Sequence, residues 1–183
     1  SGGGGLYLYN ASPTIANNTI TGNSAGLGGG VFLSGGFPTI VNNTIYGHPE
    51  GIYVRWSGGT NMVLANNAIF CPGGTAVDAS GLSGAIVQAN FVQGALSGAS
   101  LDNIAFSPGG SADSVFVNPG WFDFWPTAAA PFRGRAAPSY VPALDFNETT
   151  RATPYDVGAY ERESLSANPG WRVQPGFKSM GTT

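Results

Sequence analysis

Short runs of alternating apolar and polar residues recur along the first half of the chain, separated by glycine or asparagine. Such alternation is typical of β-strands that bury one face. The sequence PTIANNTI at residues 13–20 returns 25 residues later as PTIVNNTI at 38–45, and 24 residues further on as MVLANNAI at 62–69. A fainter copy occupies residues 86–92. The pattern predicts short strands in a repeat of about 24 residues, with no helix between them.

A second motif keeps the same phase: Gly5, Gly30 and Gly51 each open an apolar-x-apolar run, and residues 75–78 form a degraded copy. Three strands of four or five residues plus their turns use about 24 residues, which is one rung of a parallel β-helix. The sequence therefore predicts an all-β fold, a right-handed parallel β-helix of about four rungs with an irregular C-terminal closing segment. The inward columns should contain Leu6, Leu8, Val31, Leu33, Ile52 and Val54, then Ile15, Ile40 and Leu64, and finally Ile20, Ile45 and Ile69.

Paired asparagines lie where the second strand of each rung turns into the third. Asparagine tolerates the left-handed backbone of such a bend, and amides stacked about 4.8 Å apart can hydrogen-bond along the axis. We expect a structural ladder formed by Asn17, Asn18, Asn42, Asn43, Asn66 and Asn67. The alternative is N-glycosylation, since Asn10, Asn17, Asn42 and Asn147 match N-x-S/T; the better acceptors are Asn10 and Asn147, if the source adds glycans.

The repeat also suggests an organisation for the whole chain. We expect β-helix rungs at residues 1–100, an irregular capping segment that packs on the helix at 101–162, and a tail or linker at 163–183. The chain opens with Ser1 and four glycines and has no initial Met. This start suggests a partial or processed chain, in which any targeting signal would lie upstream.

Composition limits the classes of partner and cofactor. With 29 Gly, 13 Pro and only 9% charged residues, helices are disfavoured, and a hydrophobic fraction of 42% argues against disorder. A net charge of −3 provides no basic patch, so we expect no nucleic-acid binding. No apolar run is long enough for a membrane span. A single Cys and a single His exclude an internal disulfide and leave zinc almost no ligands, so no metal and no cofactor is expected.

The repeat units resemble the right-handed parallel β-helix proteins with pectate-lyase-like coils. A further match lies in the second half: VFVNP at 115–119, DF at 123–124, LDFN at 144–147, Arg151, and YDVGAYE at 155–161. This order resembles the C-terminal region of bacterial choice-of-anchor Q surface proteins, which have Asp where this chain has Asn118. The resemblance implies a secreted or cell-surface setting, but β-helices of this kind include lyases, hydrolases and adhesins, so it implies no single activity.

Outward residues of the first strands are the candidates for ligand binding. On lyase-type β-helices the substrate lies along this face, and the motif places an aromatic stripe there. The candidate carbohydrate-binding residues are Tyr7, Phe32, Tyr53, Arg55 and Trp56. The same register predicts that Val77 and Ala79 continue the face on the fourth rung. The alternative is that the segment at 101–162 folds back and covers the stripe, because bare aromatic patches of this size are uncommon.

The repeat region offers few catalytic groups. Glu50 and Asp78 are its only acids, whereas glycoside hydrolysis needs two paired carboxylates. A lyase needs a base with a cation or bound Ca²⁺, and here only His48 and Arg55 are present, without an acidic cluster. Cys71 is more typical of a packed thiol than of a nucleophile.

The acids of the second half suggest structure more than catalysis. The sequence DFNE at 145–148 lacks the glycine and final glutamate of a calcium loop. Arg151 is expected to pair with Asp156 or Glu161 as a structural strut.

Together these features favour a non-catalytic extracellular or cell-surface module with a structural, adhesive or self-assembling role, including filament formation through rung ends. The alternative is a polysaccharide lyase or hydrolase, or a carbohydrate-binding β-helix, that uses the first outer face. The candidate partners are accordingly a polysaccharide or further copies of the chain.

Overall fold

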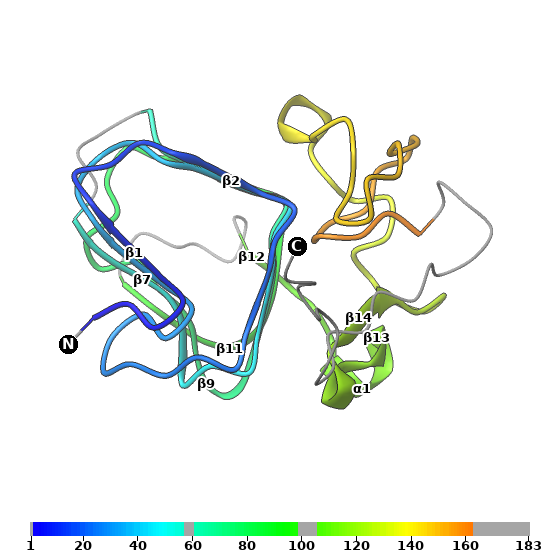
Figure 1. The fold of residues 1–183 in the computed structure, drawn as a ribbon, viewed down its shortest axis with the longest axis horizontal. Helices are drawn as coiled ribbons and strands as arrows, with labels where there is room; N and C mark the ends of the chain where they lie inside the picture. Colours follow the sequence, from blue (N-terminus) through cyan, green and yellow to red (C-terminus); the bar gives the residue numbers. More distant parts are fainter. Residues whose placement is uncertain (1, 57–60, 99–105, 163–183) are drawn as a thin grey trace, which may run out of the picture.

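The N-terminal half winds into a parallel β-solenoid whose rungs overlie one another when viewed end-on (Figure 1). The computed structural model describes residues 2–56, 61–98 and 106–162. The first face contains β1 (Leu6–Tyr9), β4 (Val31–Ser34), β7 (Glu50–Trp56) and the second halves of β9 (Ala68–Asp78) and β11 (Asn90–Ser97). The second face contains β2 (Thr14–Ala16), β5 (Thr39–Val41), β8 (Val63–Ala65) and β10 (Ile86–Gln88). The third face contains β3 (Thr19–Thr21), β6 (Thr44–Tyr46), the first halves of β9 and β11, and β12 (Phe106–Pro108).

The three predicted inward columns are confirmed by the strand register. On the second face Ile15 pairs with Ile40 and Ile40 with Leu64, and on the third face Ile20, Ile45 and Ile69 align in the same way. These side chains, with Leu33 and Val54 of the first face, form one buried core. Because each column repeats the same residue class at the rung spacing, the core is continuous along the axis.

The asparagine corner is also as predicted. Asn17, Asn42 and Asn66 have φ of 57°, 52° and 59°, and Ala89 takes the equivalent place on the fourth rung with φ of 51°. A left-handed residue is uncommon outside glycine and least costly for asparagine. The corner therefore turns the chain from the second face to the third in every rung.

Residues 109–162 build a second layer beside the third face (Figure 1). Its regular elements are α1 (Ala112–Val115), β13 (Phe116–Asn118), the 3₁₀ turn η1 (Pro119–Trp121), β14 (Asp123–Pro126) and η2 (Pro138–Tyr140). Strands β13 and β14 pair antiparallel. Phe70 of the third face contacts the rings of Phe116 and Phe132 at centroid distances of 4.9 and 6.1 Å, so a second aromatic core joins the two layers.

This placement corrects the expectation that the segment covers the first face. Its described residues pack on Ala68, Phe70 and Phe91, all of which point outward from the third face. The physical reason is the aromatic content of that face, where Tyr46 lies beside Phe70 in register and also contacts the layer through Phe124. Residues 106–162 therefore leave the first face uncovered.

The predicted register of the fourth rung on the first face is also wrong, by one residue. Val77 pairs with Ile52 and points inward, and Asp78 pairs with Tyr53. Both Val77 and Ala79 are buried. The outward position next to Tyr53 therefore carries a carboxylate.

Candidate functional site

The second asparagine of each pair forms a hydrogen-bonded ladder along the axis. The Nδ2 atoms of Asn18, Asn43 and Asn67 donate to the Oδ1 atom of the next ladder residue at 3.0, 3.0 and 2.9 Å, ending at Asn90. The backbone N–H of each donates to the same Oδ1 atom at 3.0 Å. Ladder residues Asn43, Asn67 and Asn90 are fully buried, which confirms the structural role predicted for this position.

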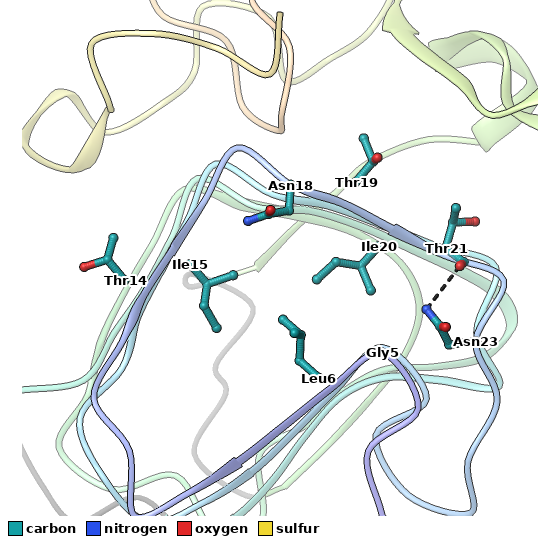
Figure 2. Close-up of a pocket in the computed structure, with 9 residues that line it drawn as sticks. All are labelled: Gly5, Leu6, Thr14, Ile15, Asn18, Thr19, Ile20, Thr21 and Asn23. Atoms are coloured by element: carbon teal, nitrogen blue, oxygen red, sulfur yellow. Dashed lines mark hydrogen bonds between the residues drawn. The ribbon is translucent and has the colours of Figure 1, made fainter. Parts of the chain in front are cut away.

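The first rung presents an open end of the solenoid (Figure 2). A hollow of about 640 Å³ is lined there by Leu6, Ile15 and Ile20, whose side chains point toward the axis, and by Asn18 at the corner. Asn18 Nδ2 donates to Ala16 O at 2.9 Å and to the next rung. Within the described part of the chain, no donor reaches Asn18 Oδ1.

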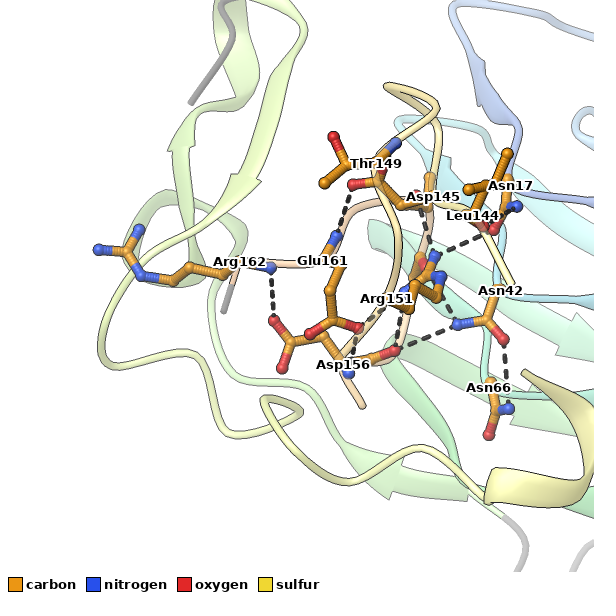
Figure 3. A network of polar contacts seen from close by, with 12 residues as sticks. Asn17, Asn42, Asn66, Leu144, Asp145, Thr149, Arg151, Asp156, Glu161 and Arg162 are labelled. Carbon is orange, nitrogen blue, oxygen red and sulfur yellow. Dashed lines mark hydrogen bonds and ion pairs between the residues drawn. The ribbon is translucent and has the colours of Figure 1, made fainter. Parts of the chain in front are cut away.

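The first asparagine of each pair points away from the axis and holds the C-terminal layer (Figure 3). Asn17 Nδ2 donates to Leu144 O at 2.6 Å, and Asn42 Nδ2 donates to Asp156 O at 3.1 Å. Asn66 makes a two-way contact, because its Nδ2 donates to Ala137 O at 3.1 Å and its Oδ1 accepts from Ala137 N at 2.7 Å. One corner of the solenoid therefore binds the layer on three successive rungs.

Arg151 lies at the centre of this contact, which we call the clasp: Asn17, Asn42, Asn66, Asp145, Arg151, Asp156, Gly158 and Glu161. Its Nη2 donates to Asn17 Oδ1 at 3.0 Å and to Gly158 O at 2.8 Å. Its Nη1 lies 3.3 Å from Glu161 Oε2, and both side chains are inaccessible to solvent. The expected structural pairing of Arg151 is thus with Glu161.

Burial dominates the electrostatics of the clasp. Desolvation raises the pKa of Glu161 to about 7, although the Asp156 N–H and the Arg151 guanidinium act in the opposite direction. Burial likewise raises the pKa of Asp156, against hydrogen bonds from the N–H groups of Arg162 and Gly134, and lowers that of Arg151. The clasp is therefore a buried polar network in which each charge depends on its partners.

The first face carries the predicted aromatic row, with an altered exposure. Tyr7 stacks on Phe32 at a centroid distance of 5.1 Å, and Phe32 on Tyr53 at 5.3 Å. Tyr7 and Trp56 are 56% and 57% exposed, and Arg55 is also exposed. Phe32, expected to face solvent, is only 4% exposed. The N-terminal glycine segment covers its ring, since a Cβ at Gly2 would lie 2.5 Å from it.

The residues considered for catalysis are bonded within the fold. His48 is buried, and its two ring nitrogens lie 2.8 and 3.0 Å from the carbonyl oxygens of Asn23 and Ile20. Glu50 Oε2 accepts from Gly28 N, and burial is the main cause that raises its pKa. The Cys71 thiol is buried, and desolvation raises its pKa to about 11, which disfavours the thiolate.

Asp78 is held by a local turn. Its Oδ1 accepts from Ser80 N at 2.9 Å and from Ser80 Oγ. Burial acts to raise its pKa, but the hydrogen bonds from Ser80 and Ser97 outweigh this and lower it. Asp78 is therefore an ionised acceptor at the end of the aromatic row.

The two glycosylation candidates differ in access. Asn10 is exposed, at a left-handed position with φ of 46°. Both terminal atoms of the Asn147 side chain are buried. Of the two, the geometry favours Asn10 as an acceptor.

The 145–148 loop is braced by its own backbone. Asp145 Oδ1 accepts from the N–H groups of Asn147 and Thr149, and its Oδ2 accepts from Glu161 N at 2.9 Å.

Among residues 2–56, 61–98 and 106–162, no group of three or more His, Cys, Asp or Glu side chains could hold a metal ion. No helix within these ranges is long and apolar enough to cross a bilayer.

Stacked parallel rungs, three buried columns and an axial asparagine ladder define a parallel β-helix. Comparison with protein families agrees, since residues 1–106 match the family described as right handed beta helix region. This match spans more than half of the chain, which therefore belongs to that family. Comparisons with curated proteins and with solved structures find no match.

Sequence reasoning missed the different roles of the two asparagines in each pair. It also missed Thr44, whose Oγ1 accepts from Ala159 N at 3.0 Å. The missed signal was the bend itself, because consecutive residues at a corner point in different directions. The first asparagines therefore face the layer, although Asn66 Nδ2 also donates to Asn42 Oδ1 at 3.2 Å, so the predicted contact between rungs holds for this pair as well.

Proposed function

We propose that the chain is a non-catalytic β-helical module with a structural or adhesive role. The observation that carries the proposal is that groups suited to chemistry are engaged in holding the fold. His48 lies on two backbone carbonyls, Glu50 accepts from Gly28, and Arg151 holds three backbone carbonyls and Glu161. A catalytic acid or base must instead reach the proton it transfers on a bound substrate.

The proposed setting is extracellular or at a cell surface. Its support is the resemblance of the second half to choice-of-anchor Q surface proteins. The residues that carry this resemblance, among them Asp145, Arg151, Asp156 and Glu161, are the residues of the clasp. The resemblance thus falls on a set of side chains that act together in the fold.

Incubation with uronate and neutral polysaccharides tests the proposal, with unsaturated products followed by absorbance and new chain ends by a reducing-sugar assay. The expected result is no product above a heat-denatured sample. Product formation that is lost in a Glu50→Gln/Asp78→Asn double variant would overturn it. That variant should keep the circular dichroism spectrum of the parent protein, because both side chains lie outside the core.

A second candidate function is carbohydrate binding on the first face. It is supported by the stacked row of Tyr7, Phe32 and Tyr53 with the exposed Trp56 and Arg55, since aromatic faces and charged tips suit sugar rings. Because Phe32 is covered, the rings open to a sugar are Tyr7 and Trp56, with the half-buried Tyr53.

A glycan array followed by titration calorimetry tests this function. Tyr7→Ala, Tyr53→Ala and Trp56→Ala should each weaken binding of the retained glycan at least fivefold. The matched control is Trp121→Ala, which removes an equally exposed ring from η1, in the C-terminal layer. Equal losses in the control, or no retained glycan, would exclude the row as a binding site.

A further inference from the structure

The open end of the first rung has the chemistry of an interrupted rung-to-rung interface. Leu6, Ile15 and Ile20 continue the three core columns, and they line the hollow shown in Figure 2. On the opposite side the same residues pack on Val31, Ile40 and Ile45 in register. The apolar surface of this end therefore matches the surface that the second rung presents to the first.

The backbone of this end has donors in matching places. Thr39 N donates to Pro13 O and Thr44 N donates to Asn18 O, each at 2.9 Å, so these N–H groups point toward the preceding rung. Thr14 and Thr19 are their equivalents one rung earlier. Their N–H groups accordingly face the open end, where a strand edge can pair with another strand.

The hydrogen bonds of the asparagine ladder all run in one direction, which leaves an acceptor at the open end. Every ladder Oδ1 from Asn43 to Asn90 accepts a backbone N–H and an amide N–H from the rung before it. Asn18 Oδ1 is the first of the series and receives neither within the described residues. The group that completes it is the backbone and amide of one more asparagine at the same corner.

The path into the first rung leaves room for such a neighbour. Residues 3–5 donate to the carbonyls of 27–29, and Gly2 bridges to Leu27, so this segment repeats the turn that leads from the first rung to the second. A chain arriving from a preceding rung can follow the same path.

The other end of the solenoid is built differently. Strand β12 pairs with the start of β11, and Phe106 lies opposite Asn90. The strand register thus puts a phenylalanine, and not an asparagine, at the fifth ladder position. Stacking of copies end to end would require β12 to leave this corner, so the last rung of this same chain is a poor match for the open end.

We propose that the open first rung is a docking surface for another parallel β-helical rung with asparagine at its ladder position, supplied by a β-helical segment other than this chain's last rung. The inference is independent of the proposed non-catalytic role, because it rests only on the rung interface. The partner is defined by three features: apolar columns over Leu6, Ile15 and Ile20, strand edges over Thr14 and Thr19, and one asparagine over Asn18.

An internal duplication in the full chain tests the proposal. A copy of residues 5–29 is inserted between Gly4 and Gly5, and amide exchange at Thr14 and Thr19 of the original rung is followed by NMR. The expected result is exchange at least tenfold slower than in the parent protein. Exchange at the parental rate in a duplicated protein whose remaining amides keep their protection would overturn the proposal.

Two controls make the outcome specific. The same duplication with Asn18→Ala in the added copy alone should lose most of the added protection at Thr14 and Thr19. Equal protection with and without this substitution would overturn the requirement for asparagine. The parent protein should sediment as a monomer at all concentrations. Protection of Thr14 and Thr19 that grows with protein concentration would assign the surface to a second copy and overturn the assignment to another segment.

Discussion

Replacement of one ladder asparagine should cost far more in the middle of the solenoid than at its open end. Asn67 Nδ2 contacts Ile40 O, Ala65 O and Asn90 Oδ1 at 2.8, 3.0 and 2.9 Å, and its Oδ1 accepts the backbone and amide N–H groups of Asn43. The side chain is fully buried. The variant Asn67→Ala removes all of these contacts without admitting water.

The magnitude follows from the groups left behind. The Asn43 N–H and the Ile40 carbonyl lose a partner in a dry core, at about 1 to 3 kcal/mol for each group left unsatisfied, whereas the Ala65 carbonyl keeps the Asn42 N–H at 3.2 Å. We therefore expect Asn67→Ala to lower the free energy of unfolding by about 2 to 5 kcal/mol, a large share of a typical domain's stability. Asn18→Ala removes the same chemical group, but water reaches the open end, so its cost should be about 1 kcal/mol.

Urea unfolding of both variants, followed by circular dichroism, measures the difference. The comparison is matched, because the two residues are both asparagines at the same position within their rungs and receive the same substitution. Equal losses in the two variants, or a loss below about 1 kcal/mol for Asn67→Ala, would refute the argument that ladder bonds stabilise the solenoid by burial.

Further predictions concern the clasp. Arg151→Met should lower the free energy of unfolding by about 3 to 5 kcal/mol, because a buried carboxylate loses its partner, while exposed Arg135→Met should leave urea unfolding unchanged. Since the native pKa of Glu161 is raised to about 7, its contribution to stability should fall as pH rises from about 4.5 to 7, and Glu161→Gln should abolish this component of the pH profile. Gly158→Ala should cost at least about 1 kcal/mol more than Gly22→Ala in thermal unfolding; both have left-handed φ, but only at Gly158 would the Cβ meet a threonine hydroxyl, at 3.0 Å.

The repeat allowed the inward residues of the second and third faces to be predicted from the sequence. Within each of the three Asn-Asn motifs the strands keep the same spacing from the asparagines, so Ile15, Ile40 and Leu64 could be aligned by counting. Counting failed where the third face leads into the first, because this connection changes length: Ile45 and Ile52 are seven residues apart, but Ile69 and Val77 are eight apart. A slip of one residue in a strand exchanges its inward and outward side chains, which is the error made at Asp78.

The position of the C-terminal layer was not predictable from the repeat alone. Outward residues form no part of the repeating core, and aromatic side chains occur on both the first and third faces. Tyr46 and Phe70 occupy aligned positions and give the third face its own apolar row, a signal visible only once the register is known. On the first face Phe32 is covered instead by glycine-rich backbone, which a side-chain pattern does not reveal.

The clasp changes how the solenoid holds together. Each rung of a repeat protein contacts only its neighbours, so the stability of the protein is a sum of local terms. Its terminal rungs can therefore unfold before the others. Arg151 binds Asn17, while the segment it braces binds Asn42 and Asn66, and these three residues lie on successive rungs. A single buried network therefore couples the first rung to the third without passing through the ladder. At the first three corners the adjacent asparagines divide this work. The second of each pair bonds its neighbours along the axis, and the first faces the layer that ties the rungs together, with one added bond between rungs from Asn66 to Asn42.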